Sequence, residues 1–287
     1  MDIMSIIVIS LCFLALIIAS ISDLKTREVP DWLNYGLIIA GFVINGMFSI
    51  VQWHPKLILY SMLGFAITFI IALIMFYTGQ WGGGDAKMLM GLGALIGFNL
   101  KFEGLFVSFL LAILFIGAIY GLLWSLGLAL RDFSKFFKRF REIMHEKTQF
   151  RIRITCLSLS TIAIISVFIV KDNATKLLLV STVILLYFML YLYFFIKSVE
   201  EICMYKQTPT SKLTEGDWIA EDVKKGKRVI ASKKDLGISL EQINLLKKLQ
   251  IKKVLVKQGI PFTPSFLFSF LFAVVYGNIL TIVIQLV

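Results

Sequence analysis

The stretch GQWGGGDAKMLMG, residues 79–91, places one aspartate, Asp85, between a run of glycines and an apolar segment. Glycine lacks a side chain and frees the backbone, so Gly82, Gly83 and Gly84 predict a loop along which an extended peptide can approach Asp85 closely. In a membrane, backbone outside a helix is tolerated only where protein or a water-filled cavity covers it. The stretch therefore predicts a carboxylate beside a peptide-binding cavity.

The rest of the chain is mostly apolar. Of its 287 residues 58% are hydrophobic and 16% are charged, and the mean hydropathy is +0.86, far from the balance of a soluble domain. Windows long enough to cross about 30 Å of hydrocarbon lie at residues 4–22, 32–51, 57–77, 104–130, 154–170, 177–196 and 265–287. A shorter window, residues 87–98, carries Gly91, Gly93 and Gly97, which permit close helix packing. The sequence predicts an all-α polytopic membrane protein with about eight transmembrane helices.

The loop charges predict the orientation of these helices. An N-terminus outside the cell places 25 of the 29 lysines and arginines on the cytoplasmic side, including eight in residues 131–153 and thirteen in residues 198–262. The net charge of +11 then follows from topology, so we expect a bilayer with anionic lipids as a partner and no nucleic acid. The predicted location is the cytoplasmic membrane.

Three regions follow from this pattern. Residues 1–197 form the membrane-embedded region, with the acidic pair within residues 23–85 and a basic cytoplasmic loop at 131–153; residues 198–262 form a soluble cytoplasmic insert; and residues 263–287 form a C-terminal transmembrane helix. In the insert, TEGDW (214–218) predicts a turn, GISLEQINLLKKL (237–249) a helix with Ser239 and Gln242 as a capping box, and KKVLVK (252–257) a strand. The insert is therefore predicted to be α+β.

Cysteine and histidine usage gives no support for a metal or a cofactor. Cys12, Cys156 and Cys203 stand singly, without a Cys-x-x-Cys pair, and His54 and His145 lie far apart in the chain. Neither pattern is typical of a disulfide framework or a zinc site. We expect no metal and no cofactor.

Two carboxylates meet the membrane at the same face in this topology. Asp23 ends the first predicted span and Asp85 begins the short fourth one. An ionisable group at the edge of a hydrocarbon span is costly unless it faces a bundle interior or water, so it indicates a functional site. Two carboxylates at close range favour one protonated and one ionised member, so the pair can both activate water and donate a proton. This is the chemistry of aspartic proteases, and such a pair titrates as a unit.

Simpler interpretations of the same residues remain open. Asp85 can be an ordinary N-cap for a helix that starts at Ala86, and Asp23 alone can be a boundary charge in a polar turn. Lys87 can place a substrate carbonyl or be an interfacial charge. At the level of function, an ion or proton-coupled transporter or channel also uses intramembrane carboxylates, and a scaffold with an inactive site is a third possibility.

At this point the residues resemble a known family. SDLKTREVPDWL (22–33) and GGGDAK (82–87) are similar to the paired aspartate motifs of the prepilin and preflagellin peptidases, the GxGD membrane aspartic proteases, and the tail KQGIPFTPSFLF (257–268) is similar to the archaeal branch. The resemblance implies Asp23 and Asp85 as catalytic residues, with Gly82, Gly84 and Lys87 as the surrounding, substrate-binding motif.

The resemblance also implies a substrate. It implies a six-helix protease-like core that cleaves, on the cytoplasmic side, the short basic leader of an archaellin-like or pilin-like precursor. Glu28 and Asp31 are predicted to steer that leader. The paired cysteines of the bacterial enzymes are absent here, so methyltransferase activity is not expected. The choice between archaellin and pilin precursors, and the oligomeric state, stay open.

Overall fold

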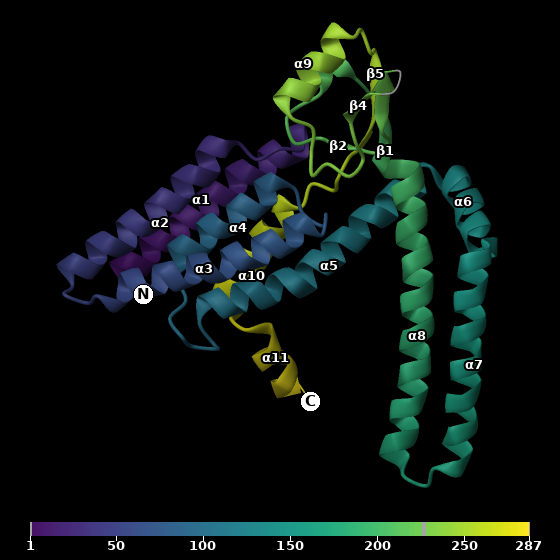
Figure 1. The fold of residues 1–287 in the computed structure, drawn as a ribbon. Coiled ribbons are helices and arrows are strands. Elements are labelled where there is room, and N and C mark those ends of the chain that lie inside the picture. The colour runs from purple at the N-terminus through teal and green to yellow at the C-terminus, as the bar shows by residue number, and fades with distance from the viewer. Residues whose placement is uncertain (1, 226–227, 287) are drawn as a thin grey trace. The chain divides into compact units, whose positions relative to one another are not determined.

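The computed structural model describes residues 2–225 and 228–286 and divides into two compact units (Figure 1). The first unit comprises Met1–Trp124, Thr208–Val254 and Gln258–Val287, and the second comprises Ser125–Gln207 and Leu255–Lys257. The units divide the chain by packing, whereas the predicted boundaries after residues 197 and 262 divide it by membrane topology. That topological division stays a prediction.

Helices dominate both units. In chain order they are α1 (Ile3–Thr26), α2 (Asp31–Val51), α3 (Lys56–Tyr77), α4 (Gly83–Ile96), α5 (Leu105–Arg131), α6 (Phe133–His145), α7 (Lys147–Ile169), α8 (Asn173–Val199), α9 (Leu240–Lys248), α10 (Thr263–Tyr276) and α11 (Ile279–Leu286). The strands are β1 (Tyr205–Pro209), β2 (Trp218–Ile219), β3 (Val223–Lys225), β4 (Arg228–Ala231) and β5 (Lys253–Lys257).

Six helices in the described part of the chain are long and apolar enough to cross a membrane. They are α1, α2, α3, α5, α7 and the stretch Asn173–Met204, which extends α8 by one irregular turn. They coincide with six of the seven long windows read from the sequence, so the chain has the helices of a multi-pass membrane protein. The total of eight crossings and the outside N-terminus stay predictions.

The expectation of one C-terminal helix over residues 265–287 is wrong for the residues that the structure describes. Helix α10 ends at Gly277, whose φ of 77° suits glycine, and α11 starts after it. Asn278 fixes the break, because its Oδ1 accepts a hydrogen bond from the Leu280 amide and its Nδ2 donates to the Phe102 carbonyl, both at 3.0 Å. Residue 287 lies outside the described residues. With 14 residues, α10 is shorter than the roughly 20 residues of a typical spanning helix.

Helix α4 is packed tightly between α2 and α3 through glycines of all three helices, among them Gly41 of α2, Gly64 of α3 and Gly93 of α4. A Cβ on Gly41 of α2 would lie 2.7 Å from the Ala94 carbonyl carbon, so only glycine permits this approach. Asn45 Nδ2 donates to the Ala94 and Leu95 carbonyls at 3.3 and 3.2 Å, and Ser61 Oγ donates to the Ala94 carbonyl at 2.6 Å. These bonds satisfy carbonyls at the C-terminal end of α4 that have no partner within the helix. The neighbouring helices thereby fix the position of α4.

The core of the first unit joins α1, α4 and α10. Leu16 of α1, Leu92 of α4, and Phe266 and Phe270 of α10 are all fully buried in one hydrophobic cluster. Trp81, which precedes α4, belongs to the same cluster. This packing brings the end of α1, the start of α4 and the start of α10 together (Figure 1).

The segment predicted as a soluble insert contains the small sheets and α9. Strands pair in the order β1-β5-β2, and β3 pairs antiparallel with β4 with a register shift between Val223 and Lys224. Three local predictions are confirmed: the turn at Glu215–Gly216, the Ser239–Gln242 capping box at the start of α9, and the strand β5. The cytoplasmic location of this segment stays a prediction.

The second unit is built on the α7–α8 hairpin and the amphipathic helix α6. Phe136 and Ile143 of α6 are buried, near Val199 and Phe194 of α8 respectively. Around them, Arg139 forms ion pairs with three carboxylates: Glu142, Glu146 and Glu201. The apolar face of α6 is therefore used in packing and its polar face in an ion-pair network.

Candidate active site

Asp23 lies in the last turn of α1, and it is only 5% exposed. The helix ends at Arg27, which adopts φ 64° and whose amide donates to the Asp23 carbonyl at 2.9 Å. The turn that follows is closed by the hydroxyl of Ser22, which donates to the Glu28 carbonyl at 2.8 Å, and by the hydroxyl of Thr26. The polar residues of this stretch thus end α1 within one turn after Asp23, whose side chain lies in the protein interior.

Asp85 lies in the first turn of α4, where it is partly buried. Gly82 is the N-cap, with φ −70° and ψ 161°, and the helix starts at Gly83. Gly84 lies close to α2 and to the turn after α1: its carbonyl accepts a hydrogen bond from Asn34 Nδ2 of α2 at 3.4 Å, and a Cβ at position 84 would lie 3.2 Å from Val29 Cβ. The glycine motif therefore brings the start of α4 against the segment that follows Asp23.

The two carboxylates contact one and the same residue, Thr263. The Thr263 amide donates to Asp23 Oδ2 at 3.0 Å, and the Thr263 hydroxyl donates to Asp85 Oδ1 at 3.0 Å. Thr263 is the first residue of α10, and it is fully buried. Asp23 and Asp85, 62 positions apart in the sequence, are therefore brought to a shared site by a residue far from both.

Aromatic side chains lie next to Thr263 in the chain and in space. Phe262 lies 5.7 Å from Trp81 and 5.5 Å from Phe266 between ring centroids, so residues before α4 and at the start of α10 pack together. On another side Tyr120 lies 6.5 Å from Phe262. The surroundings are apolar, and in such surroundings electrostatic interactions between charged groups and substrate are strong.

A basic side chain, Arg27, joins the end of α1 to the segment before α10. Arg27 Nη1 donates to the Gly259 carbonyl at 3.1 Å, and the Arg27 guanidinium lies 5.3 Å from the centre of the Trp124 ring. The segment before α10 is thereby attached to the turn that follows Asp23. The contacts of both aspartates with Thr263 can hold the two carboxylates close enough to share a proton, which is what activation of a water molecule requires.

The prediction of a non-helical loop at Gly82–Gly84 is corrected by the structure. Only Gly82 is extended, whereas Gly83 and Gly84 are helical, since α4 begins three residues before Ala86. The alternative in which Asp85 is the N-cap is wrong for the same reason, because Gly82 occupies the N-cap position. The glycine at position 84 is needed for its close approach to Val29, and not for an extended backbone.

Lys87, two residues after Asp85, is partly exposed and contacts residues of α2. Its Nζ forms an ion pair with Asp31 Oδ1 at 2.6 Å and lies 5.1 Å from the centre of the Tyr35 ring. Asp31, at the start of α2, is thus engaged with Lys87. The substrate-binding role of Lys87, and the steering role of Glu28 and Asp31, stay predictions.

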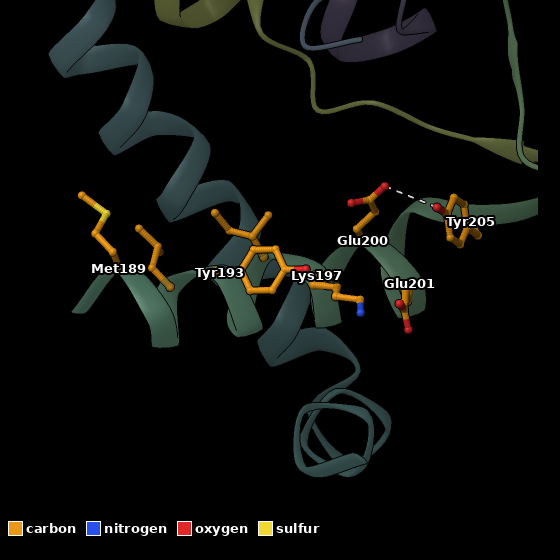
Figure 2. A pocket seen from close by; sticks show the side chains of 8 residues that line it. Met189, Tyr193, Lys197, Glu200, Glu201 and Tyr205 are labelled. Carbon is orange, nitrogen blue, oxygen red and sulfur yellow. Dashed lines mark hydrogen bonds between the residues drawn. The ribbon is translucent and has the colours of Figure 1, made fainter. Parts of the chain in front are cut away.

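A cavity in the second unit is the second candidate for a functional site. It has a volume of about 550 Å³, lies within the second unit and is open to the surface (Figure 2). It is lined by Met189, Leu192, Tyr193, Ile196, Lys197, Glu200, Glu201 and Tyr205. Glu201 pairs with Arg139 and Lys197 with Glu146, while the Tyr205 hydroxyl donates to Glu200, as the dashed line in Figure 2 shows. Because these carboxylates already have partners, the aspartate pair is the better candidate for chemistry.

Sequence reasoning missed Thr263 as a site residue. The segment KQGIPFTPSFLF was noted for its similarity to the archaeal peptidases, but a threonine followed by proline is also an ordinary start of a helix. The available signal was a small polar residue at the N-terminus of an apolar helix, where a free amide and a hydroxyl can both serve a carboxylate.

Comparison with known proteins gives matches in the N-terminal part of the chain. Residues 10–122 match the model of the type IV leader peptidase family, a range that includes Asp23 and Asp85 and excludes Thr263. The chain is 42% identical over 83 residues to the preflagellin peptidase of Methanocaldococcus jannaschii and to that of Methanococcus voltae. It is 28% identical over 89 residues to the prepilin peptidase EppA of Methanothermobacter thermautotrophicus.

These matches cover a limited share of each protein. The alignments with the two preflagellin peptidases span 29% of this chain and 35% of each relative, and the alignment with the prepilin peptidase spans 31% of this chain and 23% of the relative. No solved structure matches the chain. The chain thus matches about a third or less of the length of each of these relatives.

Proposed function

We propose that the protein is a membrane-embedded aspartic endopeptidase with Asp23 and Asp85 as its catalytic residues. Its substrates are archaellin-like or pilin-like precursors, from which it removes the short basic leader peptide at the cytoplasmic face of the membrane. The observation that carries the proposal is the shared contact of Asp23 and Asp85 with Thr263 in a largely buried site. The similarity of residues 10–122 to type IV leader peptidases supports the choice of substrate.

The reaction follows from the chemistry of a carboxylate pair. One carboxylate takes a proton from a water molecule, whose oxygen attacks the carbonyl carbon of the scissile amide, while the other donates its proton to the carbonyl oxygen. The carbon–nitrogen bond of the tetrahedral intermediate then breaks, and the leaving amine takes a proton from the pair. The two aspartates act as a unit in this scheme, so the roles of base and acid belong to the pair.

A cleavage assay tests the function directly. The purified protein is reconstituted with a membrane-inserted archaellin or pilin precursor, and release of the leader is followed by mass spectrometry. Asp23→Asn and Asp85→Asn are each expected to lower the rate at least about 100-fold, because general acid–base catalysis contributes that much. Asp2→Asn is the matched control, since Asp2 caps the other end of α1 and asparagine caps a helix equally well.

The result that contradicts the proposal is a cleavage rate in either dyad variant equal to that of Asp2→Asn. Transport without cleavage is the outcome that favours an ion or proton-coupled transporter, and it is read from ion flux into vesicles that contain the wild-type protein. The orientation is tested by protease digestion of intact and inverted vesicles. The turn at Glu215–Gly216 should be cut only in inverted vesicles, where the cytoplasmic face is accessible.

A further inference from the structure

Thr263 offers two different hydrogen-bond donors to two different carboxylates. Its backbone amide donates to Asp23 and its side-chain hydroxyl donates to Asp85. The amide of the first residue of a helix has no partner within the helix, so the N-terminus of α10 presents a free donor to Asp23. The hydroxyl adds a donor of adjustable direction, which reaches the second carboxylate.

The position of Thr263 is fixed by its neighbours on both sides. Phe262 packs among aromatic rings that include Trp81, and the Phe262 carbonyl accepts hydrogen bonds from the amide and hydroxyl of Ser265. Pro264 follows directly and restrains the backbone at the start of α10. Because Thr263 is fully buried, its hydroxyl has little access to water and Asp85 is its partner in the structure.

Thr263 holds one oxygen of each carboxylate. Asp23 Oδ2 accepts a hydrogen bond from its amide and Asp85 Oδ1 accepts one from its hydroxyl. The Gly82 backbone contributes a further hydrogen bond to Asp85. A residue that holds one oxygen of each carboxylate determines how the pair is oriented for catalysis.

We propose that Thr263 is a positioning residue of the dyad, which holds Asp23 through its amide and Asp85 through its hydroxyl. The inference rests on the proposed function in so far as it concerns catalysis, whereas the contact itself does not. Thr263 lies outside residues 10–122, so the match to the family model does not include it. The C-terminal part of the chain thereby contributes to a site whose acids lie in the N-terminal part.

The first test separates the hydroxyl from the amide, which every variant at this position except proline retains. Thr263→Val keeps the shape and removes the hydroxyl, and we expect kcat to fall about 10- to 100-fold with KM within about twofold, because the group acts on orientation of the dyad. Thr263→Ser restores the hydroxyl and should keep kcat within about threefold of wild type. Ser269→Ala is the control, since Ser269 is a buried hydroxyl of the same helix that bonds only to the Ser265 carbonyl in the structure.

The pH profile provides a readout that a purely structural role does not change. A hydroxyl that donates to a carboxylate favours its ionised form, so Thr263→Val should move the acid limb of the kcat profile to higher pH, and Ser269→Ala should leave it in place. The proposal is overturned if Thr263→Val matches Ser269→Ala in kcat and pH profile. It is equally overturned if Thr263→Ser, which keeps the hydroxyl, is more impaired than Thr263→Val, since the methyl group would then matter more than the hydroxyl.

A second test needs no cleavage. Melting temperatures of the detergent-solubilised wild type, Thr263→Val, Asp85→Ala and the double variant form a thermodynamic cycle. If the hydroxyl bonds to Asp85, the shift caused by Thr263→Val should fall to less than half in the Asp85→Ala background, because the partner is already absent. Equal shifts in both backgrounds overturn the contact. A wild-type protein that cleaves no precursor refutes the proposed function alone, and this cycle still decides the role of Thr263.

Discussion

Gly84 is the glycine whose substitution should separate the two aspartates of the proposed dyad. A Cβ at position 84 would lie 3.2 Å from Val29 Cβ and 3.3 Å from the Val29 nitrogen, closer than the roughly 3.5–4.0 Å of an optimal contact. Val29 belongs to the segment between α1 and α2, so it must move away by a few tenths of an ångström and displace the end of α1 relative to α4. Gly84→Ala therefore tests how strictly the spacing of Asp23 and Asp85 is set.

The size of the effect follows from two opposing contributions. Overpacking costs about 1–3 kcal/mol, whereas alanine gains roughly 0.5–1 kcal/mol over glycine within a helix, so Gly84→Ala should lower the free energy of unfolding by about 1 kcal/mol. A misplacement of about 1 Å at an active site can lower the rate about 100-fold, so a few tenths of an ångström should lower kcat roughly 3- to 10-fold. Gly84→Val places further carbons against Val29 and should be more severe.

Gly83→Ala is the matched control on the same helical turn. A Cβ at position 83 would lie 3.8 Å from the Phe76 ring, an ordinary contact, so this variant should retain wild-type kcat and equal or greater stability. The assay compares kcat in the precursor cleavage reaction and melting temperature for the two variants. Equal kcat values for Gly83→Ala and Gly84→Ala would refute the argument that contact with Val29 sets the spacing of the dyad.

Three further predictions concern packing and charge around the site. Gly41→Val should prevent folding or lower the melting temperature strongly, since even a Cβ would lie 2.7 Å from the Ala94 carbonyl carbon, and thermal unfolding in detergent measures this. Trp81→Ala should destabilise the protein by about 3–5 kcal/mol and lower kcat, because Trp81 is buried and packs against Phe262 beside the dyad; unchanged unfolding would contradict its place in the core. Burial raises the pKa of Asp217 above its ordinary value, so its ionisation opposes folding as pH rises past about 4. Asp217→Asn should therefore raise the melting temperature at pH 7 relative to wild type, and the gain should shrink in acid, where Asp217 is protonated.

The long helices could be predicted from the sequence because each is specified locally. A window of about 20 apolar residues has few alternatives to a helix in a membrane, so the predicted windows end within four residues of the bounds of α1, α2, α3, α5 and α8. Helix α7 starts at Lys147, seven residues before its predicted window, because its first turns are polar. The helix α9 was found for a similar reason, since the Ser239–Gln242 capping box is written in adjacent positions. Asp23 and Asp85 were found because a carboxylate at the edge of an apolar segment is rare.

The features that sequence reasoning missed depend on contacts between distant segments. Gly83 and Gly84 have low helix propensity, and their helical conformation depends on the packing of Gly84 against Val29 and of α4 between its neighbours. The break at Gly277 within the apolar stretch 265–287 is stabilised by the bond from Asn278 to the Phe102 carbonyl, 176 positions away. Hydropathy contains no information about either contact, so an uninterrupted apolar window predicts one helix.

The three segments of the site are fixed by different interactions, and this makes α10 the element that controls the dyad. A polar turn fixes the end of α1, and close backbone packing fixes the start of α4. The start of α10 is fixed by aromatic side chains that pack around Phe262. A shift of α4 relative to the rest changes the contact of the Thr263 hydroxyl with Asp85, and a shift of α1 changes the contact of the Thr263 amide with Asp23. A shift of α10 changes both at once. Substitutions that loosen α10 should therefore impair catalysis more than equally destabilising substitutions in α4, because they alter the orientation of both carboxylates together.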